Sequence, residues 1–127
     1  HVSEIADPKR ALLATGYPFR IKKLLDVYQD SFKKLFLQVS GIRRAGSAAI
    51  DLCYIACGRY DGFWELDLSP WDIAAGWLIL EEAGGMVTDF AGGRKVFESG
   101  NTIASNSALH PFLLENVQAA FKGIVEK

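Results

Sequence analysis

The sequence Pro-Trp-Asp-Ile-Ala-Ala-Gly at residues 70–76 is followed by Glu-Glu-Ala-Gly-Gly at residues 81–85. Ser69 can cap a helix, Pro70 suits a first helical turn, and an acid three positions after the cap completes a capping box. The apolar residues that follow continue the helix until two glycines end it. This stretch predicts a helix that begins directly after an extended segment and holds the Asp72 carboxylate in its first turn.

Outward from this helix, strand and helix segments alternate along the chain. The expected strands cover residues 11–15, 39–43, 60–66, 86–90 and 102–105, and the expected helices cover residues 20–37, 47–56, 70–83 and 110 onward. The helix at 20–37 has apolar residues every three or four positions, with Lys and Asp on its other face. The alternation predicts an α/β fold, layered α/β/α with a mixed sheet, in which residues 1–127 form one unit.

Composition limits the class of protein. The chain has 127 residues, of which 50% are hydrophobic, and a net charge of −1. This length allows one domain with a buried core. The charge balance does not indicate a basic nucleic-acid surface or a polybasic membrane anchor. The longest apolar runs are too short to span a bilayer, so we expect no membrane association.

Two cysteines, Cys53 and Cys57, lie four positions apart on a predicted helix. We expect both to be reduced and to face the core, because free cysteines are usually buried. A disulfide between them is disfavoured by helical geometry. A metal site lacks partners, since the only histidines are His1 and His110. Reduced thiols and the lack of a signal peptide predict a cytoplasmic protein.

Asp72 is the leading candidate for chemistry. A carboxylate in a first helical turn is stabilised by the helix dipole and by free N–H groups. The neighbouring Trp71 predicts partial shielding of this site, which suits a hard cation such as Mg²⁺. The alternative is an ordinary first-turn acid of the kind that many helices carry. One carboxylate cannot hold a catalytic metal cluster alone.

Glu65 is the second candidate, because it ends a predicted strand directly after Phe63 and Trp64. Two aromatic neighbours would place its carboxylate at the edge of a pocket. The alternative is a strand residue that faces solvent, since side chains alternate along a strand.

The third candidate is the sequence Arg-Arg-Ala-Gly-Ser-Ala at residues 43–48. Small residues at a helix start expose backbone N–H groups, and a neighbouring arginine adds positive charge. This combination suits a phosphate ester or a polyol that bears one. The alternative is a plain helix start with solvated arginines. Other classes of site lack their residues: no Cys/His nucleophile pair, no triad context for His110, no Walker loop and no dinucleotide fingerprint are found.

Together these segments resemble the inositol monophosphatase family of lithium-sensitive, Mg²⁺-dependent phosphatases, and its bacterial members most closely. The family signature Trp-Asp-x-Ala-[Ala/Gly]-Gly, followed by Glu-Ala-Gly-Gly, is matched by residues 71–76 and 82–85. Further matches lie at residues 14–16, 43–49 and 61–65. Their order and spacing cover nearly the whole chain.

The resemblance assigns roles by position. Asp72 matches an aspartate that binds an active-site Mg²⁺ and lies beside the inositol ring. Glu65 matches a glutamate that hydrogen-bonds a substrate hydroxyl, and residues 15–16 match a loop near the ring. By the same resemblance, the residues that line the substrate pocket are Asp72, Glu65, Gly46, Ser47, Ala48 and Arg43.

One part of the family pattern is missing. Members are about twice this long, and their N-terminal half contains Asp-Pro-[Ile/Leu]-Asp-Gly-Thr, which supplies further metal ligands and a threonine that helps to activate water. Residues 7–10, Asp-Pro-Lys-Arg, begin like this motif but lack the rest, and the chain opens with His1 rather than Met. We therefore expect a C-terminal half that is inactive without its N-terminal half.

The resemblance implies hydrolysis of inositol monophosphate to myo-inositol and phosphate by metal-activated water, in a homodimer. Fructose-1,6-bisphosphate or another small phosphomonoester is an alternative substrate. A different alternative is a non-catalytic binding partner of the bacterial transcription and ribosomal RNA machinery, because some bacterial relatives have that role.

Overall fold

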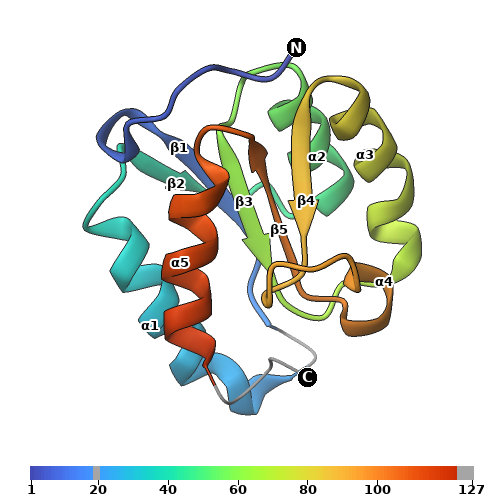
Figure 1. The fold of residues 1–127 in the computed structure, drawn as a ribbon. Coiled ribbons are helices and arrows are strands. Elements are labelled where there is room, and N and C mark those ends of the chain that lie inside the picture. The colour runs from blue at the N-terminus through green and yellow to red at the C-terminus, as the bar shows by residue number, and fades with distance from the viewer. Residues whose placement is uncertain (19–20, 123–127) are drawn as a thin grey trace.

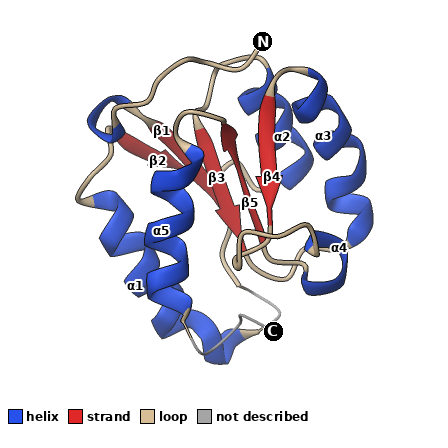
Figure 2. Cartoon of the chain, viewed as in Figure 1, coloured by secondary structure: helices blue, strands red, loops and turns tan. Residues whose placement is uncertain are grey.

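The fold is a five-stranded mixed sheet between two pairs of helices, seen in a computed structural model that describes residues 1–18 and 21–122 (Figure 1; Figure 2). The strands are β1 (Leu12–Thr15), β2 (Gly41–Arg43), β3 (Gly62–Glu65), β4 (Gly85–Thr88) and β5 (Thr102–Asn106). The helices are α1 (Leu25–Phe36), α2 (Ala48–Ala56), α3 (Pro70–Glu82), α4 (Val96–Ser99) and α5 (His110–Phe121), and short 3-10 turns occupy Pro8–Arg10 and Lys22–Leu24.

The strand order is β2-β1-β3-β5-β4. β1 runs parallel to both β2 and β3, whereas β5 runs antiparallel to β3 and β4. Thr15 pairs with Trp64, and Trp64 pairs with Ile103, so the centre of the sheet joins three distant parts of the sequence. The mixed sheet predicted from the sequence is confirmed.

Each face of the sheet has its own core. Trp64 on β3 is buried in the core beneath α1 and α5, while its neighbour Phe63 is buried in the core beneath α2 and α3. Successive residues of a strand point to opposite faces, so β3 contributes a large aromatic side chain to each layer. Figure 1 shows α1 with α5 on one side of the sheet and α2 with α3 on the other, which confirms the predicted α/β/α layers.

Two helices differ from the sequence prediction. The helix expected at residues 20–37 begins with a 3-10 turn and becomes α-helical at Leu25, and Arg20 lies outside the described residues. α4 was not expected, because four residues are too few for a periodic pattern. α5 confirms the last helix, although its expected inward residue Ile124 lies outside the described residues. Within the described ranges, no helix has the length and apolar character needed to cross a membrane.

The prediction that both cysteines face the core is wrong. Cys53 and Cys57 are free thiols, and both are exposed. α2 directs Leu52 and Ile55 toward the sheet, and each cysteine lies one or two positions further around the helix, on the side away from the sheet. The one charged residue of α2, Asp51, is buried, so the polar pattern of the sequence does not indicate this orientation.

α2 and α3 approach each other closely at Gly76. A β-carbon at this position would lie 2.6 Å from Leu52 Cδ1 and 2.8 Å from Leu52 Cβ. We expect Gly76→Ala to lower the free energy of unfolding by about 2 kcal/mol, because overpacking forces the two helices apart. Urea unfolding measures this loss. Gly41→Ala, where the nearest atoms are side-chain atoms at 3.3 Å, is the control and should cost clearly less.

Candidate functional site

The sequence candidates gather at one edge of the sheet. β1, β2 and β3 run parallel, so their carboxyl ends meet there, and the arrowhead of β3 in Figure 1 marks this edge. α2 follows β2 and α3 follows β3, so both helices begin at the same edge. Ligands of open α/β sheets bind outside the carboxyl ends of the strands, and helix N-termini there favour anions.

Asp72 lies in the first turn of α3 and is half-buried. Its Oδ2 accepts a hydrogen bond of 3.0 Å from the backbone N–H of Ser69, as a capping box requires. This bond fixes the carboxylate against the start of the helix. Trp71 does not shield the carboxylate as predicted: its side chain is 80% exposed, because the first turn of α3 directs it away from the sheet.

Glu65 is the last residue of β3 and is half-buried. It pairs with Thr102 of β5, whose side chain is fully buried. On the other side lies Gly16, where an added β-carbon would overlap the Glu65 carboxylate. The segment after β1 therefore passes directly against this carboxylate, and a side chain at position 16 would force the carboxylate to move.

Residues 43–48 connect the end of β2 to α2. Gly46 is exposed and has φ of 87°, a backbone conformation that favours glycine. Ser47 caps α2, and its Oγ accepts a hydrogen bond of 3.3 Å from the N–H of Ile50. The N–H groups of Ala48 and Ala49 have no intrahelical acceptor, as in every first turn. Arg43 ends β2 with an exposed side chain at the same edge.

A cluster of aromatic residues that the sequence did not predict lies beneath this edge. The Arg44 guanidinium lies 4.2 Å from the centre of the Tyr17 ring, and Tyr17 meets Tyr28 edge-on with ring centres 5.9 Å apart. Tyr28 stacks on Trp64, and its hydroxyl forms a 2.9 Å hydrogen bond with Oγ1 of Thr15. Burial raises the pKa of Tyr28 to about 12, so its hydroxyl stays protonated. Arg44 has no local sequence signal for this contact, because Tyr17 is distant in sequence.

An apolar groove of about 490 Å³ lies beside this aromatic cluster. Tyr17, Leu25, Tyr28 and Phe32 are among the residues that line it. Neither Glu65 nor a residue of α2 or α3 is part of its lining. The groove is therefore distinct from the polar edge described above.

The described residues do not form a metal site by themselves. No group of three or more His, Cys, Asp or Glu side chains within residues 1–18 and 21–122 could hold a metal ion. Asp72 contributes one carboxylate at the edge of the sheet, and it is already fixed by Ser69.

His110 is a buried structural residue. Ser105 Oγ donates a 2.7 Å hydrogen bond to the carbonyl of Asn106, so it accepts the 2.8 Å bond from His110 Nδ1–H. Nε2 of His110 then accepts from the hydroxyl of Thr88 at 2.9 Å. Burial lowers the pKa of His110 to about 4. Both ring nitrogens are thus satisfied by buried hydroxyls.

Comparison with known proteins agrees with this geometry. The chain matches the inositol monophosphatase family over residues 5–122. The chain belongs to that family. Its mixed sheet and helical layers are those of inositol monophosphatases of known structure.

Individual relatives show how much of the family fold is present. Nus factor SuhB of Pseudomonas aeruginosa is 50% identical over 110 residues, which are 85% of this chain and 41% of the relative. The extragenic suppressor protein suhB of Bartonella henselae superposes with a TM-score of 0.89 at 42% identity, over 98% of this chain and 46% of that one. An inositol monophosphatase of Anabaena gives a TM-score of 0.87 at 38% identity, over 93% and 47%. The chain therefore spans less than half the length of the relatives it matches.

Proposed function

We propose that this chain is the substrate-binding half of a Mg²⁺-dependent phosphatase that hydrolyses inositol monophosphate. Asp72 supplies one metal ligand. The other carboxylates come from an N-terminal half, for which the relatives are long enough. Bound Mg²⁺ would stabilise the charge on the phosphate and lower the pKa of the attacking water. Without that half we expect the chain to be inactive.

One observation carries this proposal. The first turn of α3, the end of β3 and the first turn of α2 lie at a single edge of the sheet, at the carboxyl ends of its parallel strands. These segments contribute two half-buried carboxylates, Asp72 and Glu65, and the free N–H groups of a helix start. An acidic, donor-rich edge of this kind suits a ligand with both hydroxyl and phosphate groups.

Each residue has a separate task in the proposed site. Glu65 accepts a hydrogen bond from a ring hydroxyl, because a carboxylate can only accept. Residues 46–48 line the pocket, with N–H groups as donors and no bulky side chain in the way. Arg43 adds positive charge near the substrate, and Asp72 faces both metal and ring.

The test joins this chain to the N-terminal half of the Pseudomonas aeruginosa relative. We expect the joined protein to release phosphate from myo-inositol 1-phosphate with Mg²⁺, to lose that activity with a chelator, and to be inhibited by Li⁺. Fructose-1,6-bisphosphate serves as the competing substrate. Preference for the bisphosphate would change the proposed substrate, and Mg²⁺-independent turnover would contradict the proposed reaction. By the same resemblance we expect the protein to be cytoplasmic and to form a homodimer. Light scattering can test the dimer.

A second candidate function follows from the relatives' names. The Pseudomonas aeruginosa relative is a Nus factor SuhB, and it is 50% identical to the matched part of this chain. We infer from this likeness a second, non-catalytic role as a partner of the bacterial transcription machinery. Capture of RNA polymerase and elongation factors by the joined protein, compared between wild type and a catalytically inactive Asp72→Asn variant, separates the two functions. Capture that survives in the inactive variant would support the second role.

Gly16 allows a prediction about Glu65. We expect Gly16→Ala in the joined protein to raise KM for inositol monophosphate by about 10-fold, because the new methyl group displaces the carboxylate and removes a hydrogen bond to a charged group. Steady-state kinetics measure the change. The control is Gly93→Ala, whose β-carbon would meet only ordinary contacts with Asp89 at 3.4 Å or more. An unchanged KM in Gly16→Ala would contradict the role of Glu65.

A further inference from the structure

The turn between β3 and α3 connects the two candidate carboxylates. Glu65 ends β3 and Asp72 lies in the first turn of α3, so residues 66–71 set the distance and direction between them. Within this turn Asp67 has φ of 56°, and it is the only residue other than glycine with a positive φ among the described residues. A left-handed conformation costs free energy for a residue with a β-carbon, so the surrounding structure must hold it in place.

The two residues directly before β5 hold this turn. The side-chain carbonyl of Asn101 accepts a hydrogen bond of 3.1 Å from the N–H of Asp67. The backbone carbonyl of Gly100 accepts a hydrogen bond of 2.8 Å from the N–H of Leu68. The N–H of the next residue in the turn donates to Oδ2 of Asp72 at 3.0 Å. Three consecutive N–H groups are therefore bonded, and the last acceptor is the candidate metal ligand itself.

Gly100 brings the two segments into backbone contact. Its φ is 72°, and a β-carbon at this position would lie 2.6 Å from the carbonyl oxygen of Leu68 and 3.1 Å from Cα of Asp67. Both atoms belong to the backbone, so a side chain at position 100 would push the whole turn away. Asn101 is 8% exposed, so its hydrogen bond to the turn is largely shielded from water.

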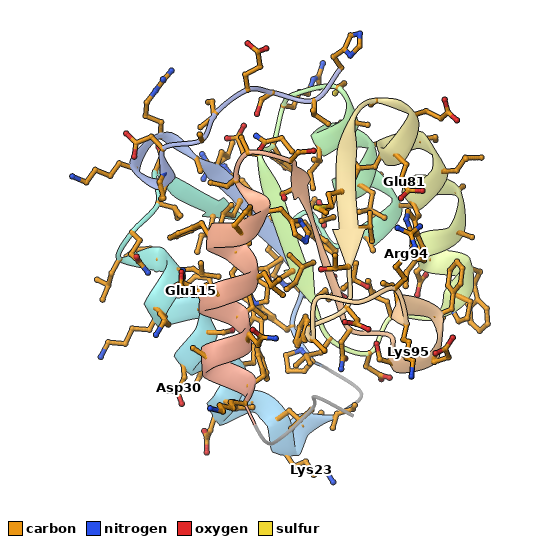
Figure 3. All side chains as sticks on the ribbon, viewed as in Figure 1. Lys23, Asp30, Glu81, Arg94, Lys95 and Glu115 are labelled. Carbon is orange, nitrogen blue, oxygen red and sulfur yellow. The ribbon has the colours of Figure 1, made fainter. Side chains whose placement is uncertain are left out.

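The segment that contains residues 100–101 is itself anchored. α4 precedes it, and Val96 at the start of α4 is fully buried in the core beneath α2 and α3. Arg94, two positions earlier, forms a 3.2 Å ion pair with Glu81 near the end of α3 (Figure 3). On the other side, Thr102 begins β5 and pairs with the last residue of β3. This segment is therefore fixed to both α3 and β3, and it can hold the turn between them.

We propose that Asn101 is a positioning residue for the candidate site, which holds the turn at Asp67 so that the two carboxylates keep their relative placement. This inference rests on the proposed function, in which Glu65 binds a ring hydroxyl and Asp72 binds the metal. A substrate that spans both groups needs them at a fixed separation, and a displacement of about 1 Å can cost about 100-fold in rate. Asn101 does not contact the substrate; it acts through the backbone of the turn.

The test compares two substrates in the protein joined to the N-terminal half of the Pseudomonas aeruginosa relative. The first, myo-inositol 1-phosphate, engages both carboxylates of the proposed site, whereas p-nitrophenyl phosphate has no hydroxyl for Glu65 to bind. Asn101→Ala removes the acceptor for the N–H of Asp67. It should lower kcat/KM by about 10-fold for the inositol ester and by about 2-fold or less for p-nitrophenyl phosphate. A general loss of folded protein would lower both values equally.

Two further variants should restore the wild-type ratio of the two kcat/KM values. Asn101→Asp keeps an acceptor oxygen in the same place. Asp67→Gly, added to Asn101→Ala, allows the turn to keep its shape without the hydrogen bond, because glycine adopts a positive φ readily. Asn116→Ala is the matched control. Asn116 is also 8% exposed and hydrogen-bonded, but it lies on α5 on the other side of the sheet, so the ratio should not change.

Hydrogen exchange gives a readout that needs no activity. In Asn101→Ala the N–H of Ser69, which donates to Asp72, should exchange about 10-fold faster than in the wild type, because opening of the turn breaks this bond. The N–H of Leu113 in α5 should exchange at the wild-type rate. Gly100→Ala displaces the same turn from the other segment, and it should change the exchange and the substrate ratio in the same direction. It serves as the test if Asn101→Ala does not fold.

The outcomes separate this inference from the proposed function. Faster exchange at Ser69, with restoration by Asn101→Asp, supports the inference even if the joined protein releases no phosphate. Wild-type exchange at Ser69 in Asn101→Ala and Gly100→Ala overturns it, even if the protein is an active phosphatase. An equal loss on both substrates, or a loss that Asn101→Asp does not restore, also overturns it. Without Mg²⁺-dependent turnover in the wild type the proposed function fails, and the exchange at Ser69 still decides the inference.

Discussion

Replacing Asp72 by asparagine should lower Mg²⁺-dependent phosphate release from inositol monophosphate by at least about 100-fold in the joined protein, a loss typical of removing one preorganised electrostatic contact. Asparagine has nearly the same shape as aspartate, and its carbonyl oxygen can still accept the hydrogen bond from the N–H of Ser69. What it lacks is the negative charge that a metal ion requires. The fold should therefore survive while the activity is lost.

Two measurements keep this prediction specific. The free energy of unfolding of Asp72→Asn should lie within about 1 kcal/mol of the wild type, because the interaction of an exposed or half-buried charge with the helix dipole is modest. Asp26→Asn makes the same chemical change in the first turn of α1, away from the site, and should leave activity unchanged. Turnover near the wild-type rate in Asp72→Asn would remove Asp72 from the proposed metal site.

Asp51→Asn should also have a large effect on the free energy of unfolding when pH is lowered. Burial raises the pKa of Asp51 to about 6, and burial lowers the pKa of His110 to about 4. Asp51 is 1% exposed and His110 is 2% exposed. Oδ1 of Asp51 is buried and lacks a hydrogen-bond partner among the described residues. These two groups make opposite contributions to stability in acid.

The direction of each contribution follows from whether the folded or the unfolded chain binds the proton. Between pH 6.5 and 4 the unfolded chain holds a proton on His110 that the folded chain lacks, so the contribution of His110 is complete above pH 6.5 and is lost as pH falls. Between pH 6 and 3.8 the folded chain holds a proton on Asp51 that the unfolded chain lacks, so stability from Asp51 increases as pH falls. Each shift corresponds to about 3 kcal/mol, and the two nearly cancel.

Asp51→Asn removes the contribution of Asp51 and leaves that of His110. Relative to the wild type, its free energy of unfolding should fall by about 3 kcal/mol as pH is lowered from 6.5 to 4, because the His110 contribution is then unopposed. Urea unfolding at several pH values measures the difference. Asp30→Asn, a change on the exposed side of α1, should show no such trend. A pH-independent difference for Asp51→Asn would mean that Asp51 is ionised in the folded chain throughout this range.

The sequence was most informative where local chemistry alone sets the structure. The cap at Ser69, the first-turn proline and the glycines after α3 predicted the boundaries of that helix, because each acts through its own backbone. The alternating strands and helices predicted the layers. The orientation of α2 was not predictable, because its one charged residue, Asp51, is buried while the two cysteines face outward.

The candidate site was predicted in part. Residues 43–48, Glu65 and Asp72 were selected from local patterns and from a family resemblance, and the fold brings them to one edge. Contacts between distant segments were not predictable: Gly16 lies against Glu65, and Tyr17 lies against Arg44, because β1 pairs in parallel with both β3 and β2. Shielding by Trp71 was wrong because neighbouring residues of a helix point in different directions.

The strand order has a consequence for how the chain folds. β3 pairs with β1 long before it in the sequence and with β5 long after it, so Trp64 joins Thr15 to Ile103. Such non-local pairing slows folding, and the central strand cannot be enclosed until the last strand has been synthesised. During translation, a chain that ends before Thr102 would leave one edge of β3 unpaired. Pauses or truncations in that interval should therefore produce a species that aggregates or needs a chaperone.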